Sequence, residues 1–134
     1  MEDDFFEDTA LVGISSALPA YKLCWTLNGY FDIEFVCEPE MTSVVQKNKV
    51  DYYLPVFQYE LPNCSHRYIL YKLKNHQVSL LPEIGKVDYL WLIKTSEPEK
   101  DANLITEGLR KISDVLLSQV IDRDDLKNIK NLIV

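Results

Sequence analysis

The chain has 134 residues, of which 47% are hydrophobic, and a formal net charge of −7. This length suits a single domain whose core holds together without disulfides or metals, and no segment is repetitive or of low complexity. The acidic pI of about 4.8 discourages binding to nucleic acid or to anionic lipid.

The segment from Met1 to Asp8 is strongly acidic and predicts a disordered tail over residues 1–8. Such a tail either keeps the protein solvated or serves as an acidic ligand for a basic partner. The chain shows neither a signal-peptide pattern nor an apolar run of membrane-spanning length, so we expect a cytoplasmic protein that does not contact membranes. The odd set of Cys24, Cys37 and Cys64 predicts free thiols.

The first elements are a strand and a helix. Thr9 to Ser15 contains β-branched residues and predicts a short strand, which ends at a serine pair. Ser16 is a candidate N-cap for a helix over Ala17 to Asn28, where apolar residues recur at helical spacing. Asn28 and Gly29 are residues that favour the left-handed conformation at which helices end.

The next segment predicts three strands. Apolar and acidic residues alternate from Phe31 to Glu38, which indicates a half-buried strand, whereas residues 39–50 are aperiodic and predict a loop. Asp51 to Glu60 and Arg67 to Lys74 predict a hairpin. Because Pro55 cannot donate a ladder hydrogen bond, the first of these two strands should lie at an edge or contain a bulge.

The last part of the chain predicts the centre of the sheet and a long helix. Asn75 to Leu81 predicts a turn and a short strand, and Val87 to Lys94 is apolar on both faces, as an interior strand under a helix layer would be. An apolar stripe predicts a helix over Ala102 to Val120. Gly108 lies on this stripe, which suggests close contact with the sheet. Residues 122–134 predict a short helix or docking tail.

A nine-residue segment carries a motif. Leu81, Pro82 and Glu83 are followed, after three residues, by Val87, Asp88 and Tyr89. This pattern resembles the signature of the IPExxxVDY family of small bacterial proteins, with Leu81 at the isoleucine position. The resemblance implies a class of protein but no activity, ligand or catalytic role.

Together these patterns predict an α+β fold. We expect a single two-layer domain over residues 9–121, with a mostly antiparallel sheet of about five strands. An N-terminal helix and a long C-terminal helix should pack on that sheet.

Two carboxylates in the motif are candidate site residues. If Glu83 and Asp88 faced one cleft, repulsion and desolvation would raise the pKa of one of them and create an acid–base pair. The alternative is that each is a surface carboxylate that pairs with a cation such as Lys86 or caps a turn. Two carboxylates five residues apart do not distinguish these alternatives.

Tyrosines surround the motif and the predicted hairpin. Tyr89, Tyr68 and Tyr71 are candidate contacts for a ligand or a partner. Aromatic residues mixed with lysines would suit a base-stacking platform for RNA, but they equally suit a sheet that packs a helix layer. The acidic pI does not favour nucleic acid.

No recognised metal or cofactor motif is present. Cys64 and His66 are zinc-ligand types, but no paired cysteine or histidine spacing supports them, and the four glycines are too scattered to form a phosphate loop. We therefore expect no cofactor, no metal and no catalytic residue.

The leading functional hypothesis is a non-catalytic cytoplasmic interaction module. It could form a homodimer, through a sheet edge or the C-terminal tail, or bind another protein. The alternatives are a small-ligand binder or enzyme with a pocket near Glu83 and Asp88, and an RNA-binding accessory protein.

Overall fold

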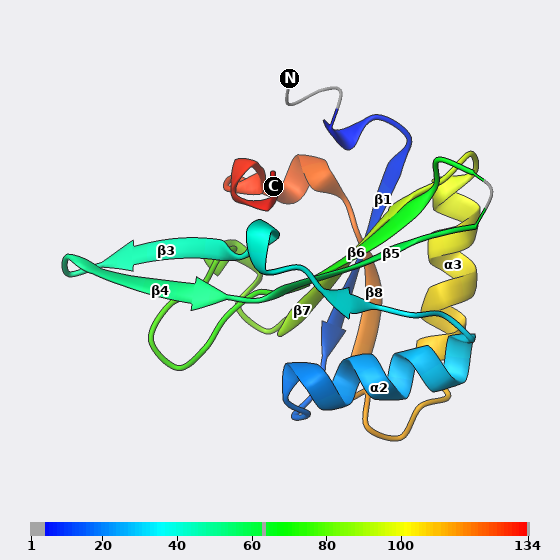
Figure 1. Cartoon of the computed structure of the whole chain (residues 1–134), viewed down its shortest axis with the longest axis horizontal. Coiled ribbons are helices and arrows are strands. Elements are labelled where there is room, and N and C mark those ends of the chain that lie inside the picture. The colour runs from blue at the N-terminus through cyan, green and yellow to red at the C-terminus, as the bar shows by residue number, and fades with distance from the viewer. Residues whose placement is uncertain (1–4, 63, 134) are drawn as a thin grey trace.

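The computed structural model describes residues 5–62 and 64–133 and shows an α+β fold (Figure 1). Every strand pair within these residues is antiparallel. The strands are β1 (Thr9–Ser15), β2 (Val36–Cys37), β3 (Ser43–Lys47), β4 (Val50–Leu54), β5 (Val56–Glu60), β6 (Arg67–Lys72), β7 (Tyr89–Lys94) and β8 (Leu117–Ile121). The α-helices are α2 (Ala20–Phe31) and α3 (Pro98–Leu109), and four 3₁₀ turns are η1 (Pro39–Met41), η2 (Pro82–Ile84), η3 (Arg123–Asp125) and η4 (Ile129–Leu132).

Six of the described strands form one sheet, and β3 and β4 form a separate hairpin. The order in the large sheet is β2-β5-β6-β7-β1-β8, so the prediction that the strand ending at Lys94 is interior is confirmed. Its residues alternate between two cores. Trp91 and Ile93 face one cluster and Leu90 and Leu92 face the other, and all four are completely buried.

The two faces of the sheet are covered differently. Helices α2 and α3 pack on one face, as predicted. The opposite face is covered by the β3–β4 hairpin, the loop between β6 and β7, and the C-terminal segment (Figure 1). Leu81 and Leu132 are buried in this second cluster, as is Phe6, so the buried part of the chain begins before Thr9. The expected two layers are therefore three.

Helix α2 buries the predicted stripe. Ala20, Leu23, Cys24 and Leu27 face the core. The start and end of the helix differ from the prediction. It begins after Pro19 and continues past Asn28 to Phe31, and Asp32, with φ of 55°, supplies the left-handed residue at its end.

Ser16 does not cap this helix. Its hydroxyl donates to the Asp114 carbonyl at 2.7 Å and accepts from the Leu18 amide, before the helix begins. The predicted cap is therefore wrong, because Ser16 instead ties the β1–α2 connection to the loop before β8.

The strand predicted over Phe31 to Glu38 is mostly not a strand. Only Val36 and Cys37 pair with β5. The Asn28 side chain accepts a hydrogen bond from the Phe35 amide at 2.8 Å and donates to the Phe35 carbonyl at 3.3 Å. These bonds replace the ladder bonds that an alternating segment would otherwise need.

The segment predicted as a loop contains β3, and the strand predicted over Asp51 to Glu60 is two strands. Pro55 separates β4, in the hairpin, from β5, in the large sheet. Asn48 and Lys49 join β3 to β4 with φ of 54° and 65°, as in a type I′ turn. This turn was not predicted, because its second residue is lysine rather than the glycine that favours such turns.

The prediction for the next segments holds in part. Strands β5 and β6 form the predicted hairpin, although β6 ends at Lys72 rather than Lys74. Between residues 75 and 81 the expected short strand is reduced to one isolated bridge between Lys74 and Ser79.

The prediction of a long C-terminal helix over Ala102 to Val120 is wrong. Helix α3 has 12 residues and ends at Leu109, and Leu117–Ile121 is an edge strand paired with β1. The apolar repeat beyond Leu109 does not form one helical stripe, since Leu116 is 74% exposed and Val120 is 46% exposed. In this segment, the pairing of Leu117–Ile121 with β1 stabilises a strand more than the helical spacing of the apolar residues favours a helix.

Residues 122–133 form two 3₁₀ turns rather than an α-helix. Leu126 and Leu132 are buried in the second cluster, so this segment docks on its own domain.

Gly108 contacts α2 rather than the sheet. A β-carbon built at this position would lie 2.7 Å from Cε1 of Phe31, whose ring packs edge-on against Trp91. Gly29, which also lies in a helix, has open space around it.

Alanine at these two helical glycines should change stability in opposite directions. We expect Gly29→Ala to raise the free energy of unfolding by up to ~1 kcal/mol, because alanine is the better helix former. Gly108→Ala should lower it by about 1 kcal/mol, because crowding against Phe31 outweighs the same gain. Urea unfolding of the two variants and of wild type measures both effects. A stabilised Gly108→Ala variant would show that Phe31 moves aside freely.

Candidate functional site: the LPExxxVDY segment and the exposed face of α2

Glu83 binds the C-terminal segment. It lies in η2, and its two carboxylate oxygens accept from the Asn128 backbone amide at 2.7 Å and from the Asn128 side-chain amide at 2.9 Å. Slight burial raises the pKa of Glu83, but the hydrogen bonds from Asn128 outweigh this effect and hold the pKa below its ordinary value. The carboxylate therefore fixes the chain just before η4.

Asp88 binds the connection between β1 and α2. Its carboxylate accepts from the Ser16 amide at 2.9 Å and forms an ion pair with Lys74 at 3.5 Å. Its backbone amide donates to the Ile14 carbonyl at 2.9 Å. Asp88 thus joins the end of β1 to the start of β7, and its carboxylate is bonded to a different segment from that of Glu83.

The three candidate tyrosines are held by the core. Tyr89 donates to the Leu18 carbonyl at 2.6 Å, and Tyr71 donates to the Leu132 carbonyl at 2.5 Å. Burial raises the pKa of Tyr89 to about 12 and also raises the pKa of Tyr71. Tyr68 packs edge-on against Trp91 with ring centroids 5.3 Å apart, and burial is the main cause of its raised pKa.

The motif therefore connects two distant parts of the chain, the C-terminal segment and the β1–α2 connection. Glu83 holds the C-terminal segment, whereas Asp88 and Tyr89 both hold the β1–α2 connection, through Ser16 and Leu18. These contacts give each of the three residues a structural role.

A hollow does lie beside Asp88. It has a volume of about 380 Å³ and is lined by residues of the β1–α2 connection together with Lys72, Lys74, Asp88 and Tyr89. Its lining is mixed polar and apolar, and Glu83 is not among its lining residues.

Among the described residues, no cluster of three or more histidine, cysteine or acidic side chains is arranged to hold a metal ion. All three cysteines are unpaired. Cys37 and Cys64 are exposed, whereas Cys24 is buried in the core, where desolvation raises its pKa to about 12.

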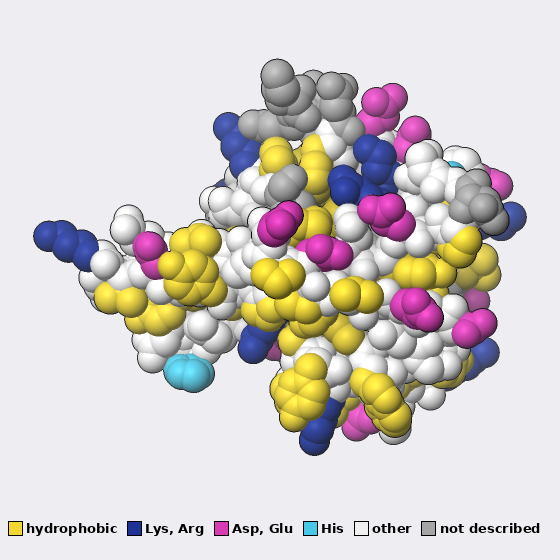
Figure 2. Space-filling model, in the orientation of Figure 1, with side chains coloured by type: hydrophobic (Ala, Val, Ile, Leu, Met, Phe, Trp, Pro, Cys, Tyr) yellow, Lys and Arg dark blue, Asp and Glu magenta, His cyan; other side chains and the backbone are white. Residues whose placement is uncertain are grey.

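The largest exposed aromatic side chains on a helix lie on α2. Trp25 is 80% exposed and Tyr21, one turn earlier, is 68% exposed. Figure 2 shows hydrophobic side chains that stand out at the lower edge of the molecule, over α2, on both sides of a basic side chain. We call Leu18, Tyr21, Trp25, Tyr30 and Asp114 the α2 surface.

Trp25 stands between two hollows in this surface. One, of about 530 Å³, is lined by Leu18, Tyr21, Trp25 and their neighbours. The other, of about 690 Å³, is lined by Trp25, Tyr30 and residues of the loop after α3. Asp114 lines both hollows. A ridge flanked by concave apolar surface is suited to binding another macromolecule rather than to catalysis.

The sequence reasoning did not single out this surface. A helical projection of residues 17–28 would have shown Tyr21 and Trp25 four residues apart, on the side opposite the buried stripe of Leu23 and Leu27. Aromatic residues on the polar face of an amphipathic helix were the available signal.

No protein-family model matches the chain, and no curated protein matches it. Within the described residues, neither α-helix nor any 3₁₀ turn combines the length and apolarity required to cross a membrane.

The contact between Glu83 and Asn128 should depend on pH. Because the folded-state pKa of Glu83 lies below its ordinary value of 4.5, this carboxylate stabilises the fold at higher pH, and the effect is lost as pH falls through the folded-state pKa. We expect Glu83→Gln to reduce stability by about 1 kcal/mol at neutral pH, given the exposure of the site.

Urea unfolding of wild type and Glu83→Gln at neutral pH and well below pH 4.5 measures this dependence. The difference between the two proteins should shrink in acid. Glu107→Gln, on an exposed position of α3, serves as the control and should show no such change. A constant difference across the pH range would contradict the role assigned to Glu83.

Proposed function

We propose that this chain is a non-catalytic interaction module that self-associates through the α2 surface. The observation that carries the proposal is the 80% exposure of Trp25 between two apolar hollows. Tryptophan and tyrosine are the side chains most enriched at the energetic centres of protein interfaces. Exposure of these side chains to water does not stabilise the folded domain, whereas each would bury a large apolar area in a complex.

A second copy of the chain fits this surface by its shape. In a two-fold symmetric dimer the same patch faces itself, so a protruding group on one copy must meet a recess on the other. The α2 surface carries both, because Trp25 stands directly beside the hollow lined by Leu18 and Tyr21. The tryptophan of each copy can enter the hollow of its partner.

The charges at the rim are also complementary. Lys22 and Asp114 both line the hollow beside Trp25. In a two-fold arrangement, Lys22 of one copy can approach Asp114 of the other, which favours correct pairing more than it adds affinity.

The cytoplasm is the proposed location. Three unpaired cysteines in a domain that needs no disulfide support it. Membership of the IPExxxVDY family is likewise a proposal, supported by five of the six motif positions between Leu81 and Tyr89.

A second candidate function is the binding of a small anion in the hollow beside Asp88. Two lysines, Lys72 and Lys74, line this hollow, and Lys74 is already paired with Asp88. Lys72 would supply the main attraction for the ligand.

The anion-binding candidate predicts a thermal shift. Phosphate and small carboxylates at millimolar concentration should raise the melting temperature of wild type, because a ligand that binds only the folded state stabilises it. Lys72→Ala should abolish this rise, whereas Lys49→Ala, at the exposed hairpin turn, should preserve it. An equal rise in both variants would indicate a nonspecific salt effect.

Self-association predicts a concentration-dependent dimer. Sedimentation equilibrium should detect a dimer of wild type at micromolar concentration. Trp25→Ala should weaken it on the order of thirtyfold, the effect typical of an interface hot spot. Tyr53→Thr removes another aromatic residue, 64% exposed on β4, and should leave the dimer intact.

Tryptophan fluorescence provides an independent measurement. Trp91 is fully buried, so its emission should not change on dilution, whereas Trp25 should shift to longer wavelength as the dimer dissociates. A wild-type protein that stays monomeric, with Trp25 emission typical of a hydrated indole at every concentration, would contradict the proposal.

A further inference from the structure

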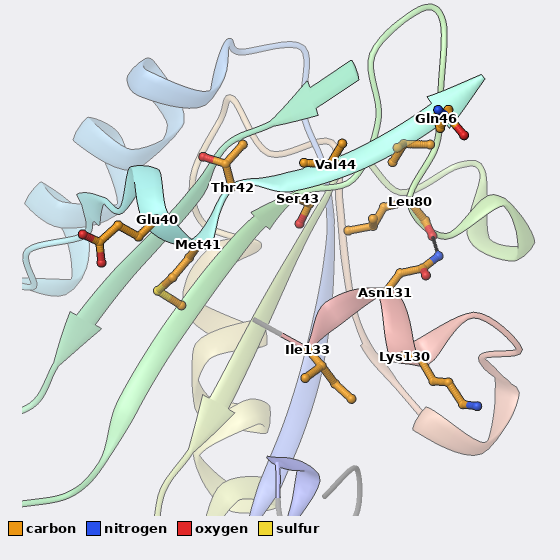
Figure 3. Close-up of a pocket in the computed structure, with 11 residues that line it drawn as sticks. Glu40, Met41, Thr42, Ser43, Val44, Gln46, Leu80, Lys130, Asn131 and Ile133 are labelled. Carbon is orange, nitrogen blue, oxygen red and sulfur yellow. Dashed lines mark hydrogen bonds between the residues drawn. The ribbon is translucent and has the colours of Figure 1, made fainter. Parts of the chain in front are cut away.

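A groove runs between the β3–β4 hairpin and the C-terminal segment, away from the α2 surface (Figure 3). Its volume is about 430 Å³. One wall is formed by β3 with the turn before it, and the other by Leu80 and the η4 region, which are joined by a 2.9 Å hydrogen bond from the Asn131 side chain to the Leu80 carbonyl. Ligand sites in proteins fall in this size range.

The strand that forms one wall has an unpaired edge. Asn48 and Lys49 make a two-residue turn, so the flanking residues Lys47 and Val50 exchange both backbone hydrogen bonds. Alternate residues of β3 then direct their N–H and C=O groups away from β4. These residues are Val44 and Gln46, and both line the groove.

Backbone groups of Val44 and Gln46 have no hydrogen-bond partner among the described residues. Such an edge is a template for another strand. Most natural edges are protected by a charge, a proline or a bulge, whereas β3 places an aliphatic residue and an amide at the two outward positions.

A second, independent observation comes from Ser43. Its side chain is 7% exposed, and its hydroxyl is buried without a hydrogen-bond partner within the described chain. Figure 3 shows the Ser43 side chain pointing from β3 into the groove, on the side of Leu80 and Ile133. A buried, unpaired hydroxyl is destabilising, so a polar group of a bound segment that reached the Ser43 hydroxyl would remove this cost.

We infer that the groove binds an extended peptide segment of a partner protein, which adds a strand to the free edge of β3. The segment pairs its backbone with Val44 and Gln46, and one of its polar groups pairs with the Ser43 hydroxyl. This mode of recognition takes affinity from main-chain hydrogen bonds and specificity from alternate side chains. The site is separate from the α2 surface and does not depend on self-association.

The walls define the chemistry of the peptide. Successive side chains of a strand point to opposite faces, so every second residue of the segment enters the groove. The residue opposite Ser43 should be small and polar, such as serine, threonine or asparagine. The next inward residue meets Val45, Leu80 and Ile133, which are aliphatic, and should be aliphatic itself. Proline is excluded where the segment must donate to β3.

Selection from a phage-displayed library of random linear peptides tests this inference. Peptides enriched on wild-type protein should alternate small polar with aliphatic residues and lack proline in the paired stretch. Hydrogen exchange at the Val44 and Gln46 amides should slow when a selected peptide, made synthetically, is added.

Two substitutions test the contacts. Val44→Pro removes an outward N–H but no bond to β4, so the hairpin persists while affinity for the selected peptide falls about tenfold. Ser43→Ala removes the unpaired hydroxyl, which should leave folding intact and weaken binding severalfold. Melting curves of both variants confirm that they fold.

Two control variants complete the test. Tyr53→Pro makes the equivalent change at the opposite edge of the hairpin, since Tyr53 is the partner of Val44, and should preserve binding. Trp25→Ala alters the α2 surface and should also preserve binding, so failure of the proposed dimer and failure of this inference are distinguishable.

Three results would overturn the inference. The first is that no peptide is enriched on wild-type protein. The second is that the selected peptides bind Val44→Pro and Ser43→Ala as tightly as wild type. The third is a wild-type dimer that Val44→Pro dissociates and Trp25→Ala does not, because a second copy of the chain would then occupy the groove.

Discussion

The structure depends on the burial of β7 on both faces. A strand with water on one side needs a single core, but β7 divides its side chains between two, with Trp91 and Ile93 on the helix side and Leu90 and Leu92 on the other. Each face therefore needs its own cover. Two helices suffice for the first, whereas the second is assembled from a loop, a hairpin and the C-terminal segment, none of which would be stable alone.

The LPExxxVDY segment fits this arrangement, because it leads directly into β7. Its apolar residues, Leu81 and Val87, are buried in the second core. Its polar residues bind the segments that must be held against the sheet: Glu83 binds the chain before η4, and Asp88 binds the β1–α2 connection. A motif of conventional catalytic residue types can thus serve as a structural junction, and a sequence pattern alone does not separate these two roles.

The sequence predicted those elements whose local pattern and tertiary role agree. The buried stripe of α2 has the helical spacing seen in the sequence, and β7 is apolar on both faces and buried on both. Strand β1 and the β5–β6 hairpin also form where β-branched residues and a turn-rich linker predicted them. The predictions failed where a specific contact outweighed the pattern. Asn28 binds the backbone of Phe35 and prevents a long strand, and β1 recruits Leu117–Ile121 from an apparent helix. Long-range contacts of this kind leave no local signature.

The residues of the candidate site also divide into those that the sequence identified and those that only the fold revealed. The sequence identified Glu83 and Asp88 as residues needing an explanation, and their partners, Asn128 and Ser16, became apparent only in the fold. Trp25 was overlooked because an exposed tryptophan and a buried one look alike without a helical projection. The groove could not have been predicted, since its two walls come from residues far apart in the chain, such as Ser43 and Asn131.

Pro55 has a mechanical consequence. It joins β4 to β5 with no intervening loop, and it is fixed by a hydrogen bond of 3.2 Å from the Lys72 amide to its carbonyl and by its buried neighbours Leu54 and Val56. A flexible tether would absorb any displacement of the hairpin. Here the projecting arm in Figure 1 continues directly into β5, so a force applied to its tip would act on β5 and on its paired strand β6.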